Sequence, residues 1–271
     1  MEYPIITSRQ NRLVREAAAL SDPAERRRRN AFLAEGARLC EDAARCGVPV
    51  RSCFFTEEAR RKYASYLAPV LSRCGEAFQV EPHVAQLLSD TKHPQGIFCV
   101  CGIPENVRFS ADSAAPSGNC VVLENIQDPG NLGTMLRTAE ALGIAEAWLL
   151  GGCCDVLSSK VLRASMGAVF REGIYLEPDV GQAVRKLRAA GYELYAAVPD
   201  ADAEPVTGAE FQAQPSAVCI GNEGNGLTPQ LIALCGNRIT IPMGGRAESL
   251  NAATAASILM WEMVRGGTGG R

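Results

Sequence analysis

The sequence predicts an α/β protein of two domains. Short apolar runs, each long enough for one buried strand, alternate with helical patterns along the chain. Near the C-terminus two such runs, Ala217–Ile220 and Ile239–Ile241, each end in a glycine-rich polar loop that precedes a helical pattern. A stretch rich in Pro, Ser and Ala, residues 104–118, is interpreted as a linker between an N-terminal domain, residues 1–103, and a C-terminal domain, residues 119–271.

Composition excludes several classes of protein. No apolar run approaches the roughly 18 residues of a membrane span, and the N-terminus lacks the apolar core of a signal peptide, so we expect a cytoplasmic protein without a membrane partner. The 11 cysteines and 2 histidines do not have the spacings of zinc sites. We therefore expect reduced thiols in core positions, no disulfide framework and no metal.

The charge distribution is uneven. The net charge is −3, yet residues 1–105 carry 15 Lys and Arg against 13 Asp and Glu, and the remainder carries 12 against 17. Contact with a polyanion would therefore depend on local basic patches in the N-terminal part.

The N-terminal domain is predicted to alternate helices and strands. The expected order is a helix to about Leu20 capped within residues 7–11, a strand at 32–34, a helix to Cys46, a strand at 50–55, helices at 57–67 and 81–88, and a strand at 96–101. The last run is continuously apolar, which is typical of a buried parallel strand.

Basic side chains in this domain are candidates for RNA contact. Four arginines follow one another at 26–29, and such runs are usually only solvated, although they can also bind phosphates. The candidate RNA-binding residues are Arg9, Arg26, Arg27, Arg28, Arg29 and Lys92. His93 and Gln95, beside Lys92, would either contact RNA or form the turn before the next strand; we favour the turn.

The C-terminal domain is predicted to be a sheet with interleaved helices. The expected elements are strands at 120–123, 147–150, 193–198, 217–220 and 239–241, and helices from Asn131 or Thr134 to Leu142, at 180–190, from Pro229 to Leu234 and from Glu248 or Ser249 to Val264. A further segment, residues 160–168, is a candidate for a short packing helix. Because strands that end in loops before helices share one edge of a sheet, we expect a ligand site there.

Three motifs lie in this domain in a fixed order. They are Pro129-x-Asn131-x-Gly133 followed by Arg137-Thr138-Ala139, then Gly221-Asn222-Glu223-Gly224-x-Gly226-Leu227, and then Ile241-Pro242-Met243 with Ser249-Leu250-Asn251. Over residues 120–265 they resemble the SpoU/TrmH family of the SPOUT RNA methyltransferases, which methylate ribose 2′-hydroxyls. One departure is small: Ala252-Ala253-Thr254 stands where relatives often carry Val-Ser. In the N-terminal domain, Glu35-Gly36 and Thr91–Gly96 resemble, on shorter matches, the substrate-binding domain that often precedes the SpoU domain and is itself similar to a ribosomal-protein RNA-binding fold.

The resemblance implies a fold, a cofactor and an assembly. It implies a trefoil knot in the catalytic domain, a homodimer formed through that domain, and S-adenosylmethionine as methyl donor. Periodicity alone would predict an unknotted doubly wound sheet. The residues implied in donor binding are Val198, Pro199, Gly221, Asn222, Glu223, Ile241, Met243, Ser249, Leu250 and Asn251.

The resemblance also implies catalytic roles, for Arg137 above all. The family proposal makes this arginine a general base, but a guanidinium resists deprotonation, so stabilisation of the developing alkoxide is an equal alternative. We expect Asn131 in the turn before the helix, contacting the substrate ribose or phosphate. Glu223 would either fix the Arg137 guanidinium or hold loop backbone, which we favour. Ser249 and Asn251 would cap the last helix and could reach Arg137 or the donor.

Other functions stay open at this level. The RNA is expected to be ribosomal because a substrate domain precedes the catalytic one, with transfer RNA as the alternative. A non-catalytic RNA-binding relative is a further alternative. A nucleotide-binding oxidoreductase is disfavoured because no G-x-G-x-x-G follows the first strand of either domain.

Overall fold

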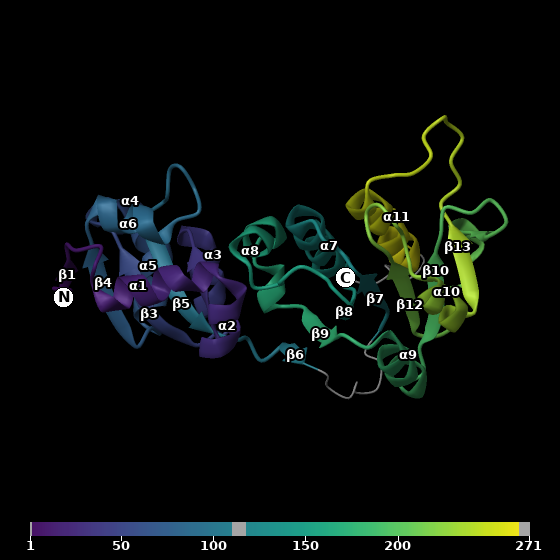
Figure 1. Cartoon of the computed structure of the whole chain (residues 1–271), viewed down its shortest axis with the longest axis horizontal. Helices are drawn as coiled ribbons and strands as arrows, with labels where there is room; N and C mark the ends of the chain where they lie inside the picture. The colour runs from purple at the N-terminus through teal and green to yellow at the C-terminus, as the bar shows by residue number, and fades with distance from the viewer. Residues whose placement is uncertain (1, 110–117, 266–271) are drawn as a thin grey trace. The chain divides into compact units, whose positions relative to one another are not determined.

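The computed structural model describes residues 2–109 and 118–265 and confirms the α/β class (Figure 1). The chain forms two compact units. The first unit comprises Met1–Glu105 and Leu157–Phe170, and the second comprises Asn106–Val156 and Arg171–Arg271. Residues 110–117 of the expected linker lie outside the described residues, and Val107–Phe109 form a short strand. The predicted domain boundaries and the predicted knot stay predictions.

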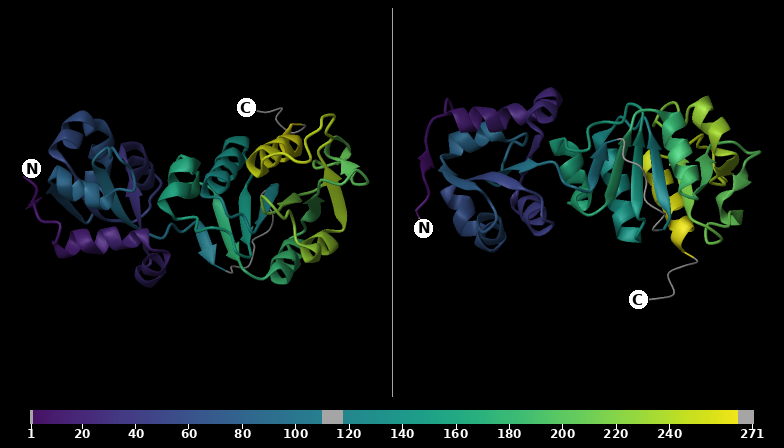
Figure 2. Two further views of the ribbon diagram at one scale, coloured as in Figure 1. Left: turned by 45° about the horizontal axis from the view of Figure 1, so that its top comes forward. Right: turned by 90° about the horizontal axis from the view of Figure 1, so that it is seen from below.

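The first unit is built on a five-stranded sheet of order β1-β4-β3-β5-β2. Its strands are β1 (Ile5–Ile6), β2 (Ala31–Glu35), β3 (Val50–Phe55), β4 (Glu76–Val80) and β5 (Ile97–Gly102). Its helices are α1 (Arg12–Ala18), η1 (Ala19–Ser21), α2 (Pro23–Arg29), α3 (Ala37–Arg45), α4 (Glu57–Lys62), α5 (Ala64–Leu71), α6 (Pro82–Leu88), α8 (Ser159–Ser165) and η2 (Ala168–Phe170). Helices cover both faces of the sheet (Figure 2), so its central strands are buried on both sides.

Two expectations for this unit are corrected, and one further segment is placed. β5 pairs antiparallel with both β2 and β3, because a continuously apolar strand requires only two covered faces and not parallel neighbours. The single helix expected at 57–67 is two helices, α4 and α5, separated at Tyr63. The arginine run 26–29 lies in α2, which is capped by Asp22 and begins with Pro23.

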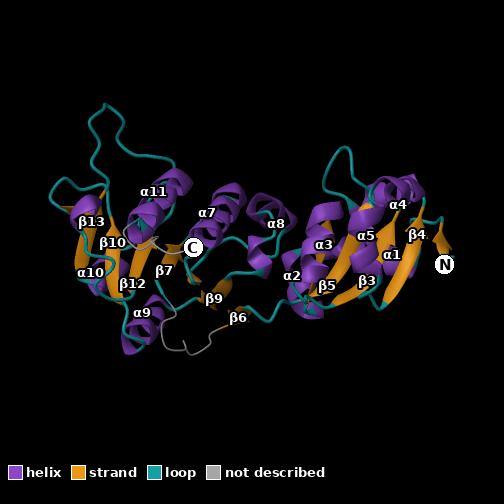
Figure 3. Cartoon of the chain, turned by 180° about the vertical axis from the view of Figure 1, so that it is seen from behind, coloured by secondary structure: helices purple, strands orange, loops and turns teal. Residues whose placement is uncertain are grey.

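The second unit contains an eight-stranded sheet of order β11-β13-β10-β12-β7-β8-β9-β6, and all its pairs are parallel. The strands are β6 (Val107–Phe109), β7 (Cys120–Glu124), β8 (Glu146–Leu150), β9 (Gly173–Glu177), β10 (Glu193–Ala197), β11 (Glu204–Pro205), β12 (Ser216–Ile220) and β13 (Asn237–Thr240). The helical elements are α7 (Pro129–Leu142), α9 (Val180–Ala189), η3 (Val206–Gly208), α10 (Pro229–Cys235) and α11 (Ala252–Val264). Helices α7 and α11 pack together on one face, and α9 and α10 lie on the other (Figure 3).

Local signals fix the helix ends near the sheet edge. α7 begins at Pro129, earlier than expected, because the Asp128 carboxylate accepts the backbone N–H of Asn131 at 2.7 Å. α7 ends as expected at Gly143, whose φ of 72° is in the left-handed region. α11 begins at Ala252 and not at Glu248 or Ser249, because Asn251 is the residue that caps it.

Most cysteines occupy the expected core positions, but Cys46 is exposed and Cys74, Cys153 and Cys154 are half-buried. All eleven cysteines are free, and seven are buried: Cys40, Cys53, Cys99, Cys101, Cys120, Cys219 and Cys235. No helix among the residues described has the length and apolar character needed to cross a membrane.

One buried carboxyl makes stability depend on pH. Glu172 is 3% exposed, and its Oε1 accepts no hydrogen bond from any described residue. Burial, and then the nearby charges of Glu140 and Glu146, raises the pKa of Glu172 from 4.5 to about 8. Between these two values the folded state binds more protons than the unfolded state, so stability falls as pH rises, by up to about 1.4 kcal/mol per pH unit.

Replacing this carboxyl with an amide is expected to remove that dependence. Urea unfolding between pH 5 and pH 8 measures this. As pH rises, the free energy of unfolding of Glu172→Gln should fall less steeply than that of wild type, by up to about 1.4 kcal/mol per pH unit. Equal slopes for the two proteins would show that Glu172 is ionised in the folded state.

Candidate active site

Four polar loops meet at the carboxyl edge of the second unit's sheet. They follow β7, β10, β12 and β13, which are neighbours in the sheet. Because all four strands are parallel, their C-terminal residues, Glu124, Ala197, Ile220 and Thr240, end at the same edge. The three motifs are thereby brought to one place, as the sequence predicts.

The loop after β12 is a tight turn shaped by Asn222. Backbone hydrogen bonds join Asn222 and Gly226 in both directions, at 3.0 and 2.9 Å. The Asn222 side-chain oxygen accepts the N–H groups of Gly224 and Asn225, and its Nδ2 donates to the carbonyl of Asn125 at 2.8 Å. A Cβ placed on Gly221 would lie 2.1 Å from the carbonyl carbon of Gly226, so this position excludes every other residue.

Glu223 joins this loop to the loop after β7. Its carboxylate accepts the backbone N–H groups of Gln127 (3.2 Å) and Asp128 (3.0 Å) and the Asn131 side-chain amide (3.1 Å). Burial acts to raise the pKa of Glu223, but these donors, together with its own backbone N–H, outweigh it and lower the pKa below its usual value. Glu223 is therefore ionised, and its contacts favour the interpretation that it holds loop backbone.

Asn131 and Asn251 connect the first motif to the third. Asn131 lies in the first turn of α7, not in the turn before it as expected, and its Oδ1 accepts from Asn251 Nδ2 at 3.1 Å. Asn251 Oδ1 accepts the N–H groups of Ala253 and Thr254, so the same side chain caps α11. A continuous chain of hydrogen bonds thus runs from Asn251 through Asn131 to Glu223.

Two substitutions at Asn251 distinguish its role as the cap of α11 from its hydrogen bond to Asn131. Asn251→Asp keeps a good cap but replaces the amide donor, so stability should hold while the activity that the motif resemblance implies declines. Asn251→Ala loses both roles and should also destabilise the fold by about 1 kcal/mol. Thermal unfolding and turnover, measured on both variants, check this; an active Asn251→Asp would show that the contact to Asn131 is dispensable.

Arg137 lies on α7, six residues or about 1.7 helical turns after Asn131, with an exposed side chain. No described residue forms a hydrogen bond or ion pair with its guanidinium, so the structure does not bring it to Glu223, Ser249 or Asn251. The neighbouring Thr138 hydroxyl lies 3.4 Å from that of Ser257 on α11. Arg137 is therefore held on a packed helix with its five donors available to another molecule.

Several of the predicted donor-binding residues in the loops after β10 and β13 offer only backbone and apolar groups. Val198 donates its N–H to the carbonyl of Ile239 at 2.9 Å, and Pro199 beside it is exposed. Residues 242–251 are exposed, including Met243 (41%) and Leu250 (37%). Ser249 caps nothing, which corrects the expectation that it shares the capping of α11 with Asn251.

Sequence reasoning missed two supports of the site. Glu124 is fully buried and accepts both the N–H and the hydroxyl of Thr228, each at 2.7 Å, which fixes the start of α10. Asp128 caps α7. An acidic residue directly before Pro129 is an N-cap signal that could have located the cap.

Two adjacent cysteines near the β7 loop do not supply a nucleophile. The Sγ of Cys153 accepts the N–H of Ile126, and burial raises the pKa of Cys153 to about 11 and that of Cys154 to about 12. Both are protonated near neutral pH, and a thiol is a weak nucleophile. Within the described part of the chain, no group of three or more His, Cys, Asp or Glu side chains could hold a metal ion.

The candidate RNA-binding arginines of α2 differ in environment. Arg26 is 6% exposed and donates to the carbonyls of Leu20 and Ser21, so its guanidinium is used within the fold. Arg28 and Arg29 share the Glu25 carboxylate, and Arg29 also lies 3.5 Å from Glu16, so their charge is partly compensated within the fold. Arg27 is exposed.

The remaining candidates in the first unit lie in loops. Arg9 precedes α1 and is exposed, and Lys92 is exposed in the loop before β5. Gln95 in that loop accepts the N–H of Ala37 at 2.8 Å, which supports the interpretation of this segment as a structural turn.

Comparisons with known proteins agree with this geometry. Residues 118–261 match the SpoU rRNA Methylase family, and residues 11–99 match the MRM3-like substrate binding domain. The chain is similar to the 23S rRNA (guanosine(2553)-2'-O)-methyltransferase RlmP of Bacillus subtilis, at 30% identity over 95% of this chain and 98% of the relative. It is also similar to a 23S rRNA (uridine(2479)-2'-O)-methyltransferase of Streptomyces viridochromogenes, at 30% identity over 98% of this chain and 93% of the relative. Among solved structures, an AdoMet-bound rRNA methyltransferase from Sinorhizobium meliloti superposes with a TM-score of 0.86, at 29% identity over 97% of this chain and 98% of the other.

Proposed function

Because the chain belongs to the SpoU rRNA Methylase family, we propose that it transfers the methyl group of S-adenosylmethionine to a ribose 2′-hydroxyl of ribosomal RNA. One observation carries this proposal: the hydrogen bonds from Asn251 through Asn131 to Glu223 hold the three motifs as one site at the carboxyl edge of the sheet. A nucleotide-binding oxidoreductase does not explain why these three loops are joined.

The donor is placed against the loops that follow β10, β12 and β13. The exposed side chains of Met243 and Leu250 offer apolar contact to an adenine face, and the strand-end backbone offers N–H and carbonyl groups to ribose and amino-acid atoms. Gly221 lets the two limbs of its loop close against each other. Glu223, ionised within this edge, favours a positively charged ligand nearby. These residues fit S-adenosylmethionine, which supplies an electrophilic methyl group when bound.

Arg137 is assigned to the transfer step. Its planar fork of donors can orient the 2′-hydroxyl and stabilise the negative charge that develops on the oxygen. Asn131, fixed between Glu223 and Asn251, is positioned to order the loop beside the ribose. No hydrogen bond or ion pair joins Arg137 to the described residues of the donor loops in one chain, so a second copy of the chain can present it to the site.

We further propose an assembly and a chain topology for this domain. We place the homodimer interface on α7 and α11, where Trp261 is 52% exposed on α11, and a trefoil knot in the segment that leads from β13 to α11. Bacterial relatives that act on 23S rRNA support a cytoplasmic location. They are named for guanosine in one case and uridine in the other, so relatives of this chain act on different bases.

Incubation of the full chain with tritiated S-adenosylmethionine and unmodified 23S rRNA tests the function. We expect label in alkali-resistant dinucleotides, which report 2′-O-methylation, and no label in transfer RNA. Thermal shifts should appear with S-adenosylmethionine and S-adenosylhomocysteine and not with NAD. Stabilisation by NAD alone would overturn the proposal in favour of an oxidoreductase, and label in transfer RNA alone would change the substrate.

A further inference from the structure

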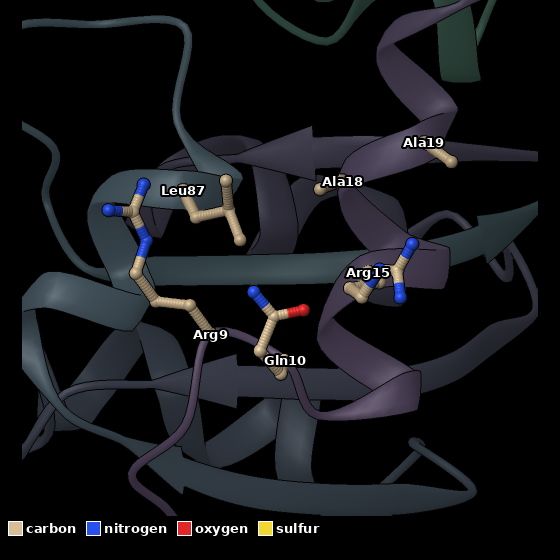
Figure 4. Close-up of a pocket in the computed structure, with 6 residues that line it drawn as sticks. All are labelled: Arg9, Gln10, Arg15, Ala18, Ala19 and Leu87. Atoms are coloured by element: carbon tan, nitrogen blue, oxygen red, sulfur yellow. The ribbon is translucent and has the colours of Figure 1, made fainter.

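A groove with a cavity volume of about 590 Å³ opens beside α1 in the first unit. It is lined by Arg9, Gln10, Arg15, Ala18, Ala19 and Leu87. Figure 4 shows Arg9 and Arg15 on opposite sides of Gln10, with Leu87 and Ala18 above it in this view. We call this feature the Arg9–Arg15 groove.

The groove carries positive charge that the protein does not neutralise. Arg9 and Arg15 are exposed, neither forms an ion pair with a described residue, and no acidic side chain lines the groove. By contrast, Arg12 on the same helix lies 3.6 Å from Glu16 and does not line the groove. Two unpaired guanidinium groups flanking a groove are a local basic patch within a chain whose net charge is −3.

The segment that carries Arg9 is anchored. Ser8 Oγ accepts the N–H of Gln10 at 3.1 Å, and Asn11 caps α1 by accepting the N–H of Leu13 at 2.9 Å. His83 Nε2, on α6, lies 2.9 Å from the carbonyl oxygen of Thr7. The spacing of the two arginines is therefore held by the turn before α1 and by α1 itself.

The groove combines three features of single-strand recognition. Its floor, formed by Ala18, Ala19 and Leu87, is apolar and suits the face of a base. The Gln10 amide offers both a donor and an acceptor for a base edge. Arginines on either side suit the phosphates that flank a nucleotide. Base faces are hidden in a duplex but are exposed in single-stranded loops and ends.

We propose that the Arg9–Arg15 groove binds one unstacked nucleotide of single-stranded RNA, with Arg9 and Arg15 contacting the flanking phosphates and the base lying against Ala18 and Leu87. This rests on the proposed function, because it takes RNA as the substrate. It specifies which face of the first unit meets the RNA and that the contacted RNA is unpaired.

Fluorescence anisotropy of a labelled 12-nucleotide single-stranded RNA, without methyl donor, tests the groove separately from catalysis. In the full-length double variant Arg9→Ala/Arg15→Ala we expect Kd to rise by about 10- to 50-fold and the slope of log Kd against log salt to fall by about 1.4, since each phosphate contact on a single strand contributes about 0.7. The duplex of the same RNA should compete poorly with wild type.

Arg12→Ala is the matched control, because it removes one arginine from the same helix outside the groove. It should leave Kd within about twofold and the salt slope within about 0.3 of wild type. The proposal would be overturned if Arg12→Ala raised Kd as much as the double variant does. It would also be overturned if wild type did not bind the 12-mer, or if the duplex competed as well as the single strand. If wild type methylates 23S rRNA but the double variant binds the 12-mer with an unchanged Kd, the groove proposal alone is overturned. If wild type does not methylate 23S rRNA, the result counts against the proposed function.

Discussion

Replacing Arg137 with alanine is expected to lower kcat for methyl transfer by about 10²- to 10³-fold, the scale found when one preorganised donor to a developing oxyanion is removed. The affinity for S-adenosylmethionine should change by less than about threefold, because no described donor-loop residue is bonded to Arg137. Single-turnover transfer to 23S rRNA and calorimetric titration of the donor measure the two quantities separately.

The chemistry of Arg137 can be examined further by conservative substitution. Arg137→Lys keeps a positive charge but loses the planar fork of donors, so it should recover only part of the rate. Arg185→Ala, an exposed arginine on α9 on the opposite face of the sheet, is the control and should retain full turnover. Full turnover in Arg137→Ala together with weak donor binding would move this residue from catalysis to donor recognition.

Replacing Gly221 with alanine is expected to weaken donor binding strongly. A Cβ at this position would lie 2.1 Å from the carbonyl carbon of Gly226 and 2.2 Å from the backbone nitrogen of Leu227. Backbone atoms cannot rotate away as a flexible side chain can, so the loop must open. Opening it breaks the paired hydrogen bonds of Asn222 and Gly226 and displaces Glu223. Donor affinity should fall by at least about 100-fold, with a stability loss above about 3 kcal/mol.

Gly224→Ala in the same loop is the matched control. The nearest atom to its added Cβ is Asn222 Oδ1 at 3.7 Å, which is an ordinary van der Waals contact. Its unfolding free energy should stay within about 1 kcal/mol of wild type. Urea unfolding and donor titration of the two glycine variants provide the comparison, and similar behaviour of both would show that the loop is not closed as described.

Strands and helix ends could be predicted where a local signal decides them. The continuous apolar run at 120–123 locates β7, and Gly143 ends α7. β5 was predicted parallel and is antiparallel, because pairing direction depends on which strands become neighbours and not on the apolar pattern. β4 was not predicted, because it has only one buried residue, Val80, and so lacks a continuous apolar run.

The site could be predicted only in part. The motif order placed three loops at one edge, but the bond between Asn131 and Asn251 joins residues 120 positions apart, and no local pattern encodes it. The choice between the two roles of Glu223 required the positions of its donors. For Arg26 the sequence pattern was misleading: a charged run indicates exposed side chains, but Arg26 is buried and donates to two backbone carbonyls.

A crystal structure of the full chain with S-adenosylhomocysteine tests the central claim most directly. We expect the ligand against Gly221–Glu223, Ile241–Met243 and Ser249–Asn251, with the guanidinium of Arg137, from the same chain or from a second copy, within reach of the position that the donor methyl group would occupy. Ligand bound elsewhere on the chain, or every Arg137 in the assembly far from it, would contradict the account.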